Sequence, residues 1–500
     1  MSSSSSSSPV IDEAHRIAAL FEYPTEEVNR GVKEFIREMD EGLEKDGTTL
    51  RQIPSYVTAV PDGTEKGVYL AVDLGGTNFR VCSVNLHGDS TFSISQSKVA
   101  IPHELMVTQH GKELFSFLAL QIDEFLKTHL TEHFAAHVEK RQTCQVTEPY
   151  AEEQLFDLGF TFSFPVDQHG INTGSLIRWT KGFDIDEVVG QDVCKLLQDA
   201  IDQRHLPVRV AALVNDTVGT LMARSYCSGQ HTKALIGAIF GTGTNGAYVE
   251  KLSRVTKLNE INSASKYDKT TGEMVINIEW GSFDNHLSVL PNTRFDADLD
   301  THSVNPGIQM FEKRVSGMFL GEILRRVLLA MSKDPAVNLF SNVAATTIPQ
   351  HSGLYNTWGI DTSFLSTVKA DHLPNLDATR AQLKRELDID NPSTDDCRAV
   401  KILVHAIGKR AARLSAVALG AVIISTGKLH EGDRVADIGV DGSVVEHYPG
   451  FEDYLRQAFR EIPEIGEEGE KRITLGVAKD GSGVGAALGA LVAREAACRC

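Results

Sequence analysis

The sequence has few cysteines and no arrangement of them that would build a redox or metal site. Seven are scattered over 500 residues without a C-x-x-C pair, so neither a disulfide framework nor a zinc site is indicated. Basic residues are also scarce. The chain has 49 Lys and Arg against 67 Asp and Glu, a formal charge of -18, which argues against nucleic acid or an anionic membrane as partner. Any anionic ligand must be held locally.

Long apolar runs and a signal peptide are absent as well. The first sixteen residues, MSSSSSSSPVIDEAHR, carry a serine run where a signal peptide needs basic residues and an apolar core. No apolar stretch reaches membrane-spanning length. We expect a cytoplasmic protein without a membrane anchor, whose first nine residues are disordered. At 500 residues and 42% hydrophobic content, two lobes are expected.

The familiar phosphate-binding and hydrolase motifs are missing too. The stretch AVDLGGTNFRVCSV, residues 71–84, places Asp73 and two glycines between apolar runs, but contains neither G-x-x-x-x-G-K-S/T nor G-x-G-x-x-G. Ser163 does not lie in a G-x-S-x-G elbow, so a covalent hydrolase has no support. Taken alone, residues 71–84 are typical of an ordinary hairpin with Asp73 as a turn residue.

The apolar pattern alternates between strands and helices, which indicates an α/β protein. Two leading helices are predicted in residues 11–45, broken at Pro24. The elements that follow are strands within 68–101, a helix at 111–130, a strand at 157–166, a polar loop at 167–183, a strand at 208–216 and a helix at 217–226. The loop at 167–183 is rich in groups that can hydrogen-bond a hydroxylated ligand.

The first hairpin pattern returns in residues 234–250, ALIGAIFGTGTNGAYVE. Setting residues 76–78 over residues 243–245 aligns apolar strand residues on both sides, so one hairpin looks as if it is used twice. Two such turns facing each other across a cleft could hold a polyphosphate through backbone N–H groups. Asp73 could then hold magnesium through water.

The carboxyl-terminal region adds a glycine-rich turn that runs into a helix, VAKDGSGVGAALGALVA, residues 477–493. Gly485 and Gly489 lie four apart, which lets this helix lie tightly against a neighbour. The turn could approach a nucleotide. Asp441-Gly442 and Asp480-Gly481 are also ordinary turn dipeptides, and that alternative stays open.

Three carboxylates are candidates for chemistry. Asp216 follows a buried strand, where open α/β sheets bind ligands, although it could also be a plain helix N-cap. Glu279 flanks Trp280 between apolar runs. Glu312 begins a predicted helix at 311–331 and could be a solvated surface residue. That helix carries an apolar stripe of Phe311, Val315, Phe319 and Ile323. Dispersed carboxylates and amides suit recognition of a neutral polyol.

Taken together, these motifs resemble the hexokinase family, and within it the fungal-type glucokinases. The matching strings, in order, are LAVDLGGTNFRV, LGFTFSFPVDQHGINTGSLIRWTKGF, LVNDTVGTL, IFGTGTNGAY, EWGSFDN, FEKRVSGMFLGE, DGSVVEHYPGF and AKDGSGVGAAL. The resemblance runs from His15 to Ala493. It implies an actin-like (ribonuclease H-like), duplicated two-lobed ATPase fold with a central cleft. The expected parts are leading helices at 10–56, a small lobe at 57–214 plus 485–500, and a large lobe at 215–484.

The resemblance also implies a role for each site residue, with Asp216 as the general base. The implied sugar-binding residues are Ser163, Thr180, Lys181, Asn215, Asn245, Glu279 and Glu312. The implied ATP-binding residues are Asp73, Gly75, Gly76, Thr77, Asn78, Arg80, Lys98, Gly241, Thr242, Gly243, Thr244, Gly442 and Ser443. Asp73 would also hold Mg2+ through water.

The implied activity is ATP-dependent phosphorylation of glucose at the 6-hydroxyl, with mannose and fructose left open as further substrates. Glucose and MgATP are the expected partners. Two alternatives are a sugar sensor without turnover and a chaperone-type ATPase of the same superfamily. Asp216 argues against the sensor, and the polyol loop from Ser163 to Phe183 argues against the chaperone. The sequence predicts neither the oligomeric state nor regulation by product.

Overall fold

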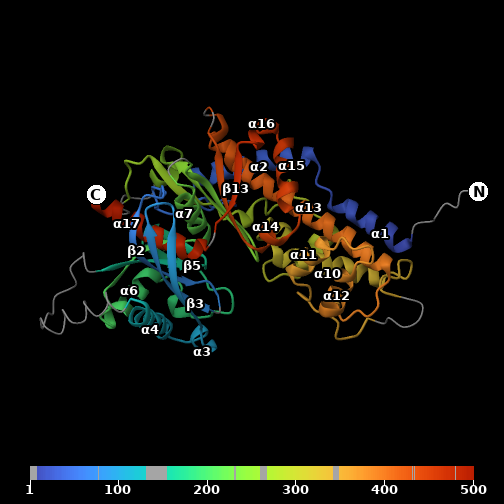
Figure 1. The fold of residues 1–500 in the computed structure, drawn as a ribbon, viewed down its shortest axis with the longest axis horizontal. Helices are drawn as coiled ribbons and strands as arrows, with labels where there is room; N and C mark the ends of the chain where they lie inside the picture. Colours follow the sequence, from blue (N-terminus) through green and yellow to red (C-terminus); the bar gives the residue numbers. More distant parts are fainter. Residues whose placement is uncertain are drawn as a thin grey trace, which may run out of the picture.

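The computed structural model describes residues 8–76, 78–130, 155–229, 232–259, 267–341, 348–430, 432, 434–478 and 480–499. Its elements gather around two large mixed sheets. In Figure 1 the first sheet, with the C-terminal helix α17, lies at one end of the molecule, and the helices α1, α10, α11, α12 and α13 extend to the other. The chain therefore has the two-part α/β architecture that the sequence predicts.

The first sheet has the strand order β4-β3-β2-β5-β8. Its strands are β2 (Lys66–Leu74), β3 (Asn78–His87), β4 (Phe92–Ala100), β5 (Phe156–Phe162) and β8 (Val208–Val214). The first three are antiparallel, and β5 and β8 run parallel to β2. Leu70 and Val72 pack in the core of α4 (Gly111–His129) and α6 (Val193–Gln203), whereas Tyr69 and Ala71 pack in that of α17 (Gly481–Arg499). Alternate residues of β2 thus bury both faces.

The second sheet repeats the topology of the first. Its order is β1-β11-β10-β9-β12-β13, again three antiparallel strands followed by two parallel ones, with β1 (Ile53–Pro54) added at one edge. The other strands are β9 (Ala234–Phe240), β10 (Thr244–Lys251), β11 (Glu273–Asn277), β12 (Ala436–Asp441) and β13 (Ile473–Val477). The repeat found in residues 234–250 is therefore a repeat of a whole sheet.

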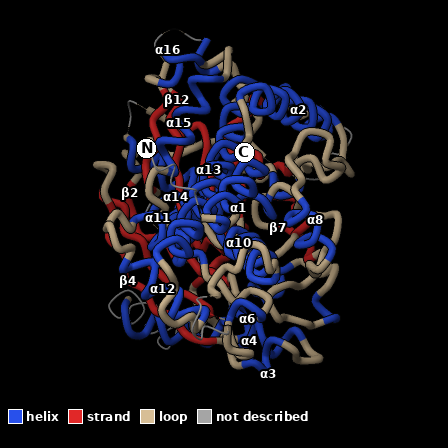
Figure 2. The backbone as a smooth tube through the Cα atoms, turned by 90° about the vertical axis from the view of Figure 1, so that its right-hand side faces the viewer, coloured by secondary structure: helices blue, strands red, loops and turns tan. Residues whose placement is uncertain are grey.

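Helices form the outer part of the second half. Figure 2 looks onto this end, where α1 (Pro9–Ala18), α10 (Gly317–Lys333) and α13 (Thr394–Ser425) lie in front of the strands. The second half also contains α2 (Thr25–Glu44), α8 (Arg294–Thr301), α9 (Glu312–Val315), α11 (Thr362–Ala370), α12 (Asp377–Leu387), α14 (Ser443–His447), α15 (Phe451–Glu461) and α16 (Gly466–Glu470). Helix α3 (His103–Met106) lies beside α4 on the first half, and α7 (Asp216–Ser228) packs on the second sheet. Of the described helices, none is long and apolar enough to span a membrane.

Three local predictions differ from the structure. Helix α1 begins at Pro9, within the stretch expected to be disordered. The predicted polar loop at 167–183 begins as a hairpin of β6 (Val166–Gly170) and β7 (Thr173–Leu176). The predicted helix at 311–331 breaks at Ser316, whose backbone is extended. The break occurs because the Gly317 amide bonds to the carbonyl of Gly241, 2.8 Å away, outside the helix.

The predicted close approach of the last helix is confirmed, and its partner is α7. A Cβ on Gly485 would lie 2.1 Å from the Cα of Gly219, so the two helices touch backbone to backbone. A Cβ on Gly489 would instead meet the Val214 side chain at 2.7 Å. Helix α17 also packs on the first sheet, where a Cβ on Gly159 would lie 1.9 Å from the Ala486 carbonyl oxygen. The crossing of α7 and α17 therefore links the two halves.

We predict that Gly485→Ala destabilises the protein by about 3 kcal/mol, because neither backbone can yield to the added methyl group. Gly489→Ala is the matched control, since it adds the same helix propensity, about 1 kcal/mol, in the same helix. There the Val214 side chain can rotate away. Urea unfolding of both variants should show a loss of stability only for Gly485→Ala. Equal urea midpoints for the two variants would contradict the prediction.

Candidate active site

Five charged side chains from both halves converge on one site. They are Asp73 at the end of β2, Lys181 after β7, Asp216 at the start of α7, Glu279 after β11 and Glu312 at the start of α9. Lys181, Glu279 and Asp73 all act on the pKa of Asp216. Glu279, Asp216 and Lys181 act on the pKa of Glu312. The structure thus brings together residues that the sequence scatters over 240 positions.

Asp216 is not the N-cap of its helix. That position belongs to Asn215, whose Oδ1 accepts hydrogen bonds from the Thr217 amide at 2.9 Å and the Thr217 hydroxyl at 2.5 Å. Asp216 is the first helical residue, and its Oδ1 shares the Thr217 amide at 2.9 Å. The pKa of Asp216 is raised to about 6, mainly by burial; Lys181 opposes this shift, and the nearby Glu279 and Asp73 add to it. This carboxylate is poised to take up a proton near neutral pH.

Lys181 is aimed at the first glycine turn. Its Nζ donates to the carbonyl oxygens of Gly75 and Ser163, both at 2.8 Å. Burial lowers the pKa of Lys181, and the carboxylates of Asp216, Asp73 and Glu312 oppose that shift. Thr180 precedes it in the same turn, and its carbonyl accepts from the Phe183 amide at 3.2 Å. Of the predicted residues, Ser163 and Lys181 therefore border the loop after β2, and Thr180 is the chain neighbour of Lys181.

Asn245 and Glu279 meet through a residue that the sequence analysis missed. Asn277 Nδ2 donates to Glu279 Oε1 at 2.8 Å, and Asn277 Oδ1 accepts from Asn245 Nδ2 at 2.8 Å. Asn245 Nδ2 also lies 3.2 Å from Glu279 Oε1. Glu279 adopts a left-handed conformation with φ of 57°. The sequence signal for Asn277 is its position, as an amide residue at the end of β11 and two residues before Glu279.

Glu312 is not the solvated surface residue that was one reading of its helix. Its Oε2 accepts a hydrogen bond from the Thr244 amide at 2.9 Å. A Cβ on Gly243 would lie 2.9 Å from the same oxygen, so glycine makes room for the carboxylate. Burial raises the pKa of Glu312 to about 7, opposed by the Thr244 amide. Glu312 therefore ties the second glycine turn to the polar cluster.

The first glycine turn opens onto a cavity of about 750 Å3. Its lining residues are Asp73, Gly75, Gly76, Asn78, Arg80, Gln96 and Lys98. Asp73, Arg80 and Lys98 form one row across three strands, because Arg80 pairs in register with Asp73 on β2 and with Lys98 on β4. The predicted residue Thr77 lies outside the described residues. The row presents two cations beside one carboxylate, an arrangement suited to an anion that carries a metal.

The second glycine turn contacts the predicted adenosine side. The Gly241 amide donates to the Gly243 carbonyl at 3.0 Å. Gly442, with φ of 113°, packs on the Phe240 backbone, where a Cβ would lie 2.5 Å from the carbonyl carbon. The turn contains Gly241, Thr242, Gly243 and Thr244, and Ser443 follows Gly442 at the start of α14. Thr242 is exposed.

The hydroxyl of Thr244 supports the turn from inside. It donates to the Ile239 carbonyl at 2.9 Å and accepts from Trp280 Nε1 at 3.0 Å. Thr244 is buried, and these bonds of its hydroxyl hold the loop in shape. Gly317, which bonds to Gly241, was not predicted as part of this region. Only the tertiary contact identifies it.

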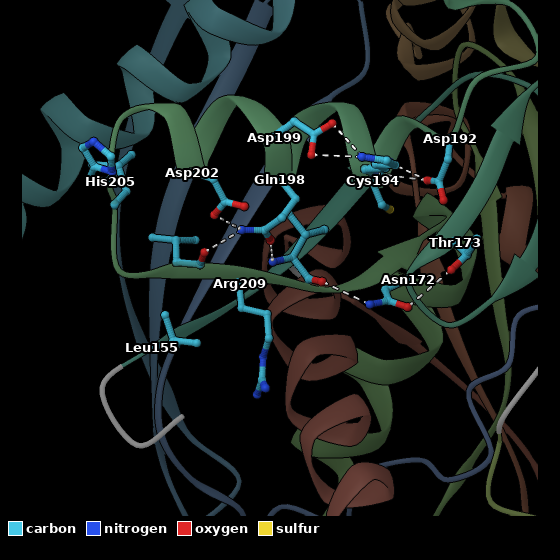
Figure 3. Close-up of a pocket in the computed structure, with 14 residues that line it drawn as sticks. Leu155, Asn172, Thr173, Asp192, Cys194, Gln198, Asp199, Asp202, His205 and Arg209 are labelled. Atoms are coloured by element: carbon cyan, nitrogen blue, oxygen red, sulfur yellow. Dashed lines mark hydrogen bonds and ion pairs between the residues drawn. The ribbon is translucent and has the colours of Figure 1, made fainter. Parts of the chain in front are cut away.

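A second cavity lies apart, between α6 and β8 (Figure 3), with a volume of about 680 Å3. The Gln198 amide nitrogen donates to Asp202 Oδ1 at 2.9 Å, and its oxygen accepts from the Val210 amide at 2.7 Å. Lys195 pairs with Asp199 at 2.8 Å. Because these polar groups of the cavity wall already bond one another, we assign it no ligand.

Comparisons with known proteins identify the family of the chain. Residues 13–226 and 235–492 match two family models, each described as Hexokinase. The chain is 65% identical over 491 residues to a glucokinase of Aspergillus niger, covering 98% of each chain. The chain belongs to the hexokinase family. It is also 42% identical over 505 residues to glucokinase-1 of Saccharomyces cerevisiae, covering 97% of each chain.

A solved hexokinase supports the same assignment. The hexokinase of Schistosoma mansoni complexed with glucose is 33% identical, covers 96% of this chain and 98% of its own, and superposes with a TM-score of 0.77. The predicted family and the actin-like, two-lobed fold are therefore confirmed. As a hexokinase, the protein is a phosphotransferase that acts on a hexose.

We predict that Asp216→Asn stabilises the ligand-free hexokinase at pH 8. Because the folded pKa of about 6 exceeds the unfolded value of about 3.9, the native state binds the extra proton, and stability falls as pH rises between these values. Asparagine removes this cost. The free energy of unfolding should rise by about 2 kcal/mol at pH 8. This is less than the whole pKa shift would give, because solvent reaches the carboxylate, and the difference should vanish near pH 4.

Urea unfolding at pH 8 and pH 4 measures the difference. Asp73→Asn is the control, because it removes a partner of Arg80, 3.3 Å away, and should bring no gain. If Asp216→Asn changes stability equally at both pH values, burial of the charge is not the cause.

Proposed function

We propose that this hexokinase transfers the γ-phosphoryl group of ATP to the 6-hydroxyl of glucose, giving glucose 6-phosphate and ADP. The observation that carries the proposal is the position of Asp216. Its carboxylate, with a pKa raised mainly by burial to about 6, is close enough to interact with Glu279, a proposed sugar ligand, and with Asp73, on the wall of the first cavity. A base between a sugar site and a phosphate loop can take the proton of the sugar hydroxyl while the phosphoryl group passes from ATP to that hydroxyl.

The proposed sugar site uses both halves of the chain. Carboxylates of Glu279 and Glu312 accept hydrogen bonds from sugar hydroxyls, and the amide of Asn245 is oriented by Asn277. The remaining proposed contacts come from Ser163, Thr180, Lys181 and Asn215. Mannose and fructose differ from glucose at few hydroxyls, and we leave them as further candidate substrates.

The proposed ATP site lies between the two glycine turns. Arg80 and Lys98 supply positive charge beside the first turn. In the second turn the proposed phosphate donors are the backbone amides of Thr242 and Gly243, because those of Gly241 and Thr244 bond the Gly243 carbonyl and Glu312. Asp73, on the cavity wall, fits Mg2+ bound through water, because that ion favours carboxylates and retains its own waters. When bound, the ion would neutralise charge on the phosphates. Gly442 and Ser443 would border the adenosine.

In the proposed reaction, Asp216 takes the proton of the 6-hydroxyl as that oxygen bonds to the γ-phosphorus. The bond from the γ-phosphorus to the bridging oxygen breaks, and ADP leaves with the electron pair. The proton then passes from Asp216 to solvent. Lys181, held by the carbonyls of Gly75 and Ser163, supplies a positive charge near both reacting groups.

The test is the variant Asp216→Asn, which we expect to lower kcat by about 10²-fold or more while leaving glucose binding nearly intact. ADP release in a coupled assay should depend on added hexose in the wild type. Asp192→Asn is the matched control, because Asp192 caps α6 and its Oδ1 accepts from the Cys194 amide at 2.9 Å. Hexose-independent ATP hydrolysis would favour a chaperone-type ATPase. Unchanged turnover in Asp216→Asn would show that Asp216 is not the general base.

We further propose that glucose closes a small lobe at 57–214 plus 485–500 on a large lobe at 215–484. Contacts from Lys181 on one side and Glu279 and Glu312 on the other would let sugar binding drive closure and exclude water. Small-angle scattering should show a smaller radius of gyration with glucose. Xylose, which lacks the phosphorylated arm, should raise background ATP hydrolysis. An unchanged radius together with no effect of xylose would indicate a preformed site.

A further inference from the structure

Arg80, on the wall of the 750 Å3 cavity, is held mainly by groups from the far end of the sequence. Its Nη1 donates to Asp480 Oδ1 at 2.6 Å, and its Nη2 donates to the hydroxyl of Ser482. The contact with Asp73 Oδ2 is longer, 3.3 Å. Asp480 and Ser482 lie at the turn into α17, which reaches the first sheet through the bond from the Thr161 hydroxyl to the Ser482 carbonyl, 2.8 Å.

These groups form a partly enclosed charge cluster. The side chains of Arg80, Asp73 and Asp480 are 19%, 21% and 22% exposed, so solvent screens their interactions less than on an open surface. Burial alone would lower the pKa of Arg80, but Asp480 and Asp73 reverse the shift and raise it. One guanidinium therefore serves two carboxylates, and Asp480 has the shorter contact.

We propose that Asp480 is a positioning residue that draws Arg80 away from Asp73 and so keeps the Asp73 carboxylate available for the metal of MgATP. The inference rests on the proposed function of this cavity. Without the charge of Asp480, Arg80 has Asp73 as its remaining carboxylate partner and closes onto it. The incoming metal must then compete with a guanidinium for the same oxygens.

Asp480→Asn isolates the charge. Asp480 has a left-handed backbone with φ of 57°, a conformation that Asn tolerates as well as Asp, so the turn should keep its shape. We expect the KM for MgATP to rise about tenfold, as is typical when a group that orients a ligand is lost. The half-saturating Mg2+ concentration at fixed ATP should rise with it, whereas the KM for glucose should stay within about twofold, because the sugar residues are not touched.

The decisive measurement is a double-mutant cycle with Arg80→Gln. If Asp480 acts through Arg80, adding Asp480→Asn to Arg80→Gln should change the KM for MgATP no further. A merely structural role in the turn would worsen both backgrounds alike. Asp388→Asn is the matched control, because Asp388 is also left-handed, with φ of 52°, and pairs with Lys384 at 2.5 Å on α12. It should leave every kinetic constant unchanged.

Two failures remain distinguishable. If the wild type shows no hexose-dependent ADP release, the proposed function is wrong. If the wild type turns over but Asp480→Asn leaves the KM for MgATP unchanged, or raises it equally in the Arg80→Gln background, the role of Asp480 is overturned. Thermal unfolding of each variant, and calorimetric titration with Mg2+ and a nonhydrolysable ATP analogue, separate lost binding from lost folding.

Discussion

The backbone contact between Gly219 and Gly485 is the constraint on which the rest of the structure depends. Helix α7 begins at Asp216 beside the second sheet, and α17 packs on the first. Five strands follow the same order in each sheet, and each sheet is complete in itself, so another contact must join the two at close range. A side chain at either glycine would hold the helices apart and move the Asp216 carboxylate relative to both glycine turns. Two residues without a Cβ therefore set the geometry of the proposed chemistry.

The site carries an electrostatic cost that the remainder of the fold must offset. Burial raises the pKa of both Asp216 and Glu312, which means that their charged forms destabilise the ligand-free protein at neutral pH. Lys181 relieves part of this cost, and amides such as that of Thr244 relieve more. The carboxylate oxygens of Asp216 and Glu312 can accept further hydrogen bonds, and sugar hydroxyls supply the donors. Stability and binding are therefore opposed at the same residues.

The proposed phosphate site does not depend on a patch of basic residues. The chain has a formal charge of -18, and the cations near the first turn include Arg80 and Lys98 on its strands and Lys181, which bonds the Gly75 carbonyl. Arg80 is shared between Asp73 and Asp480, so its charge is already partly neutralised before a ligand arrives. Backbone amides in the glycine turns provide donors without adding charge. A phosphate-bearing ligand that brings its own metal fits such a balance.

Much of this could be predicted from the sequence because it is encoded locally. Strand periodicity, the break at Pro24, the doubled glycine hairpin and the small residues at Gly485 and Gly489 all depend on neighbours in the chain, and they gave the sheets, the leading helices and the tight helix contact. The resemblance to hexokinases supplied the family and the list of candidate site residues. What only the tertiary structure decided concerns contacts between distant segments. The cap at Asn215 instead of Asp216, the break at Ser316, the burial of Glu312 and the bonds from Asp480 to Arg80 and from Asn277 to Asn245 all depend on which groups meet in space. A hydrogen bond or a desolvated charge is set by distance in three dimensions, and the local pattern of the chain does not carry that distance.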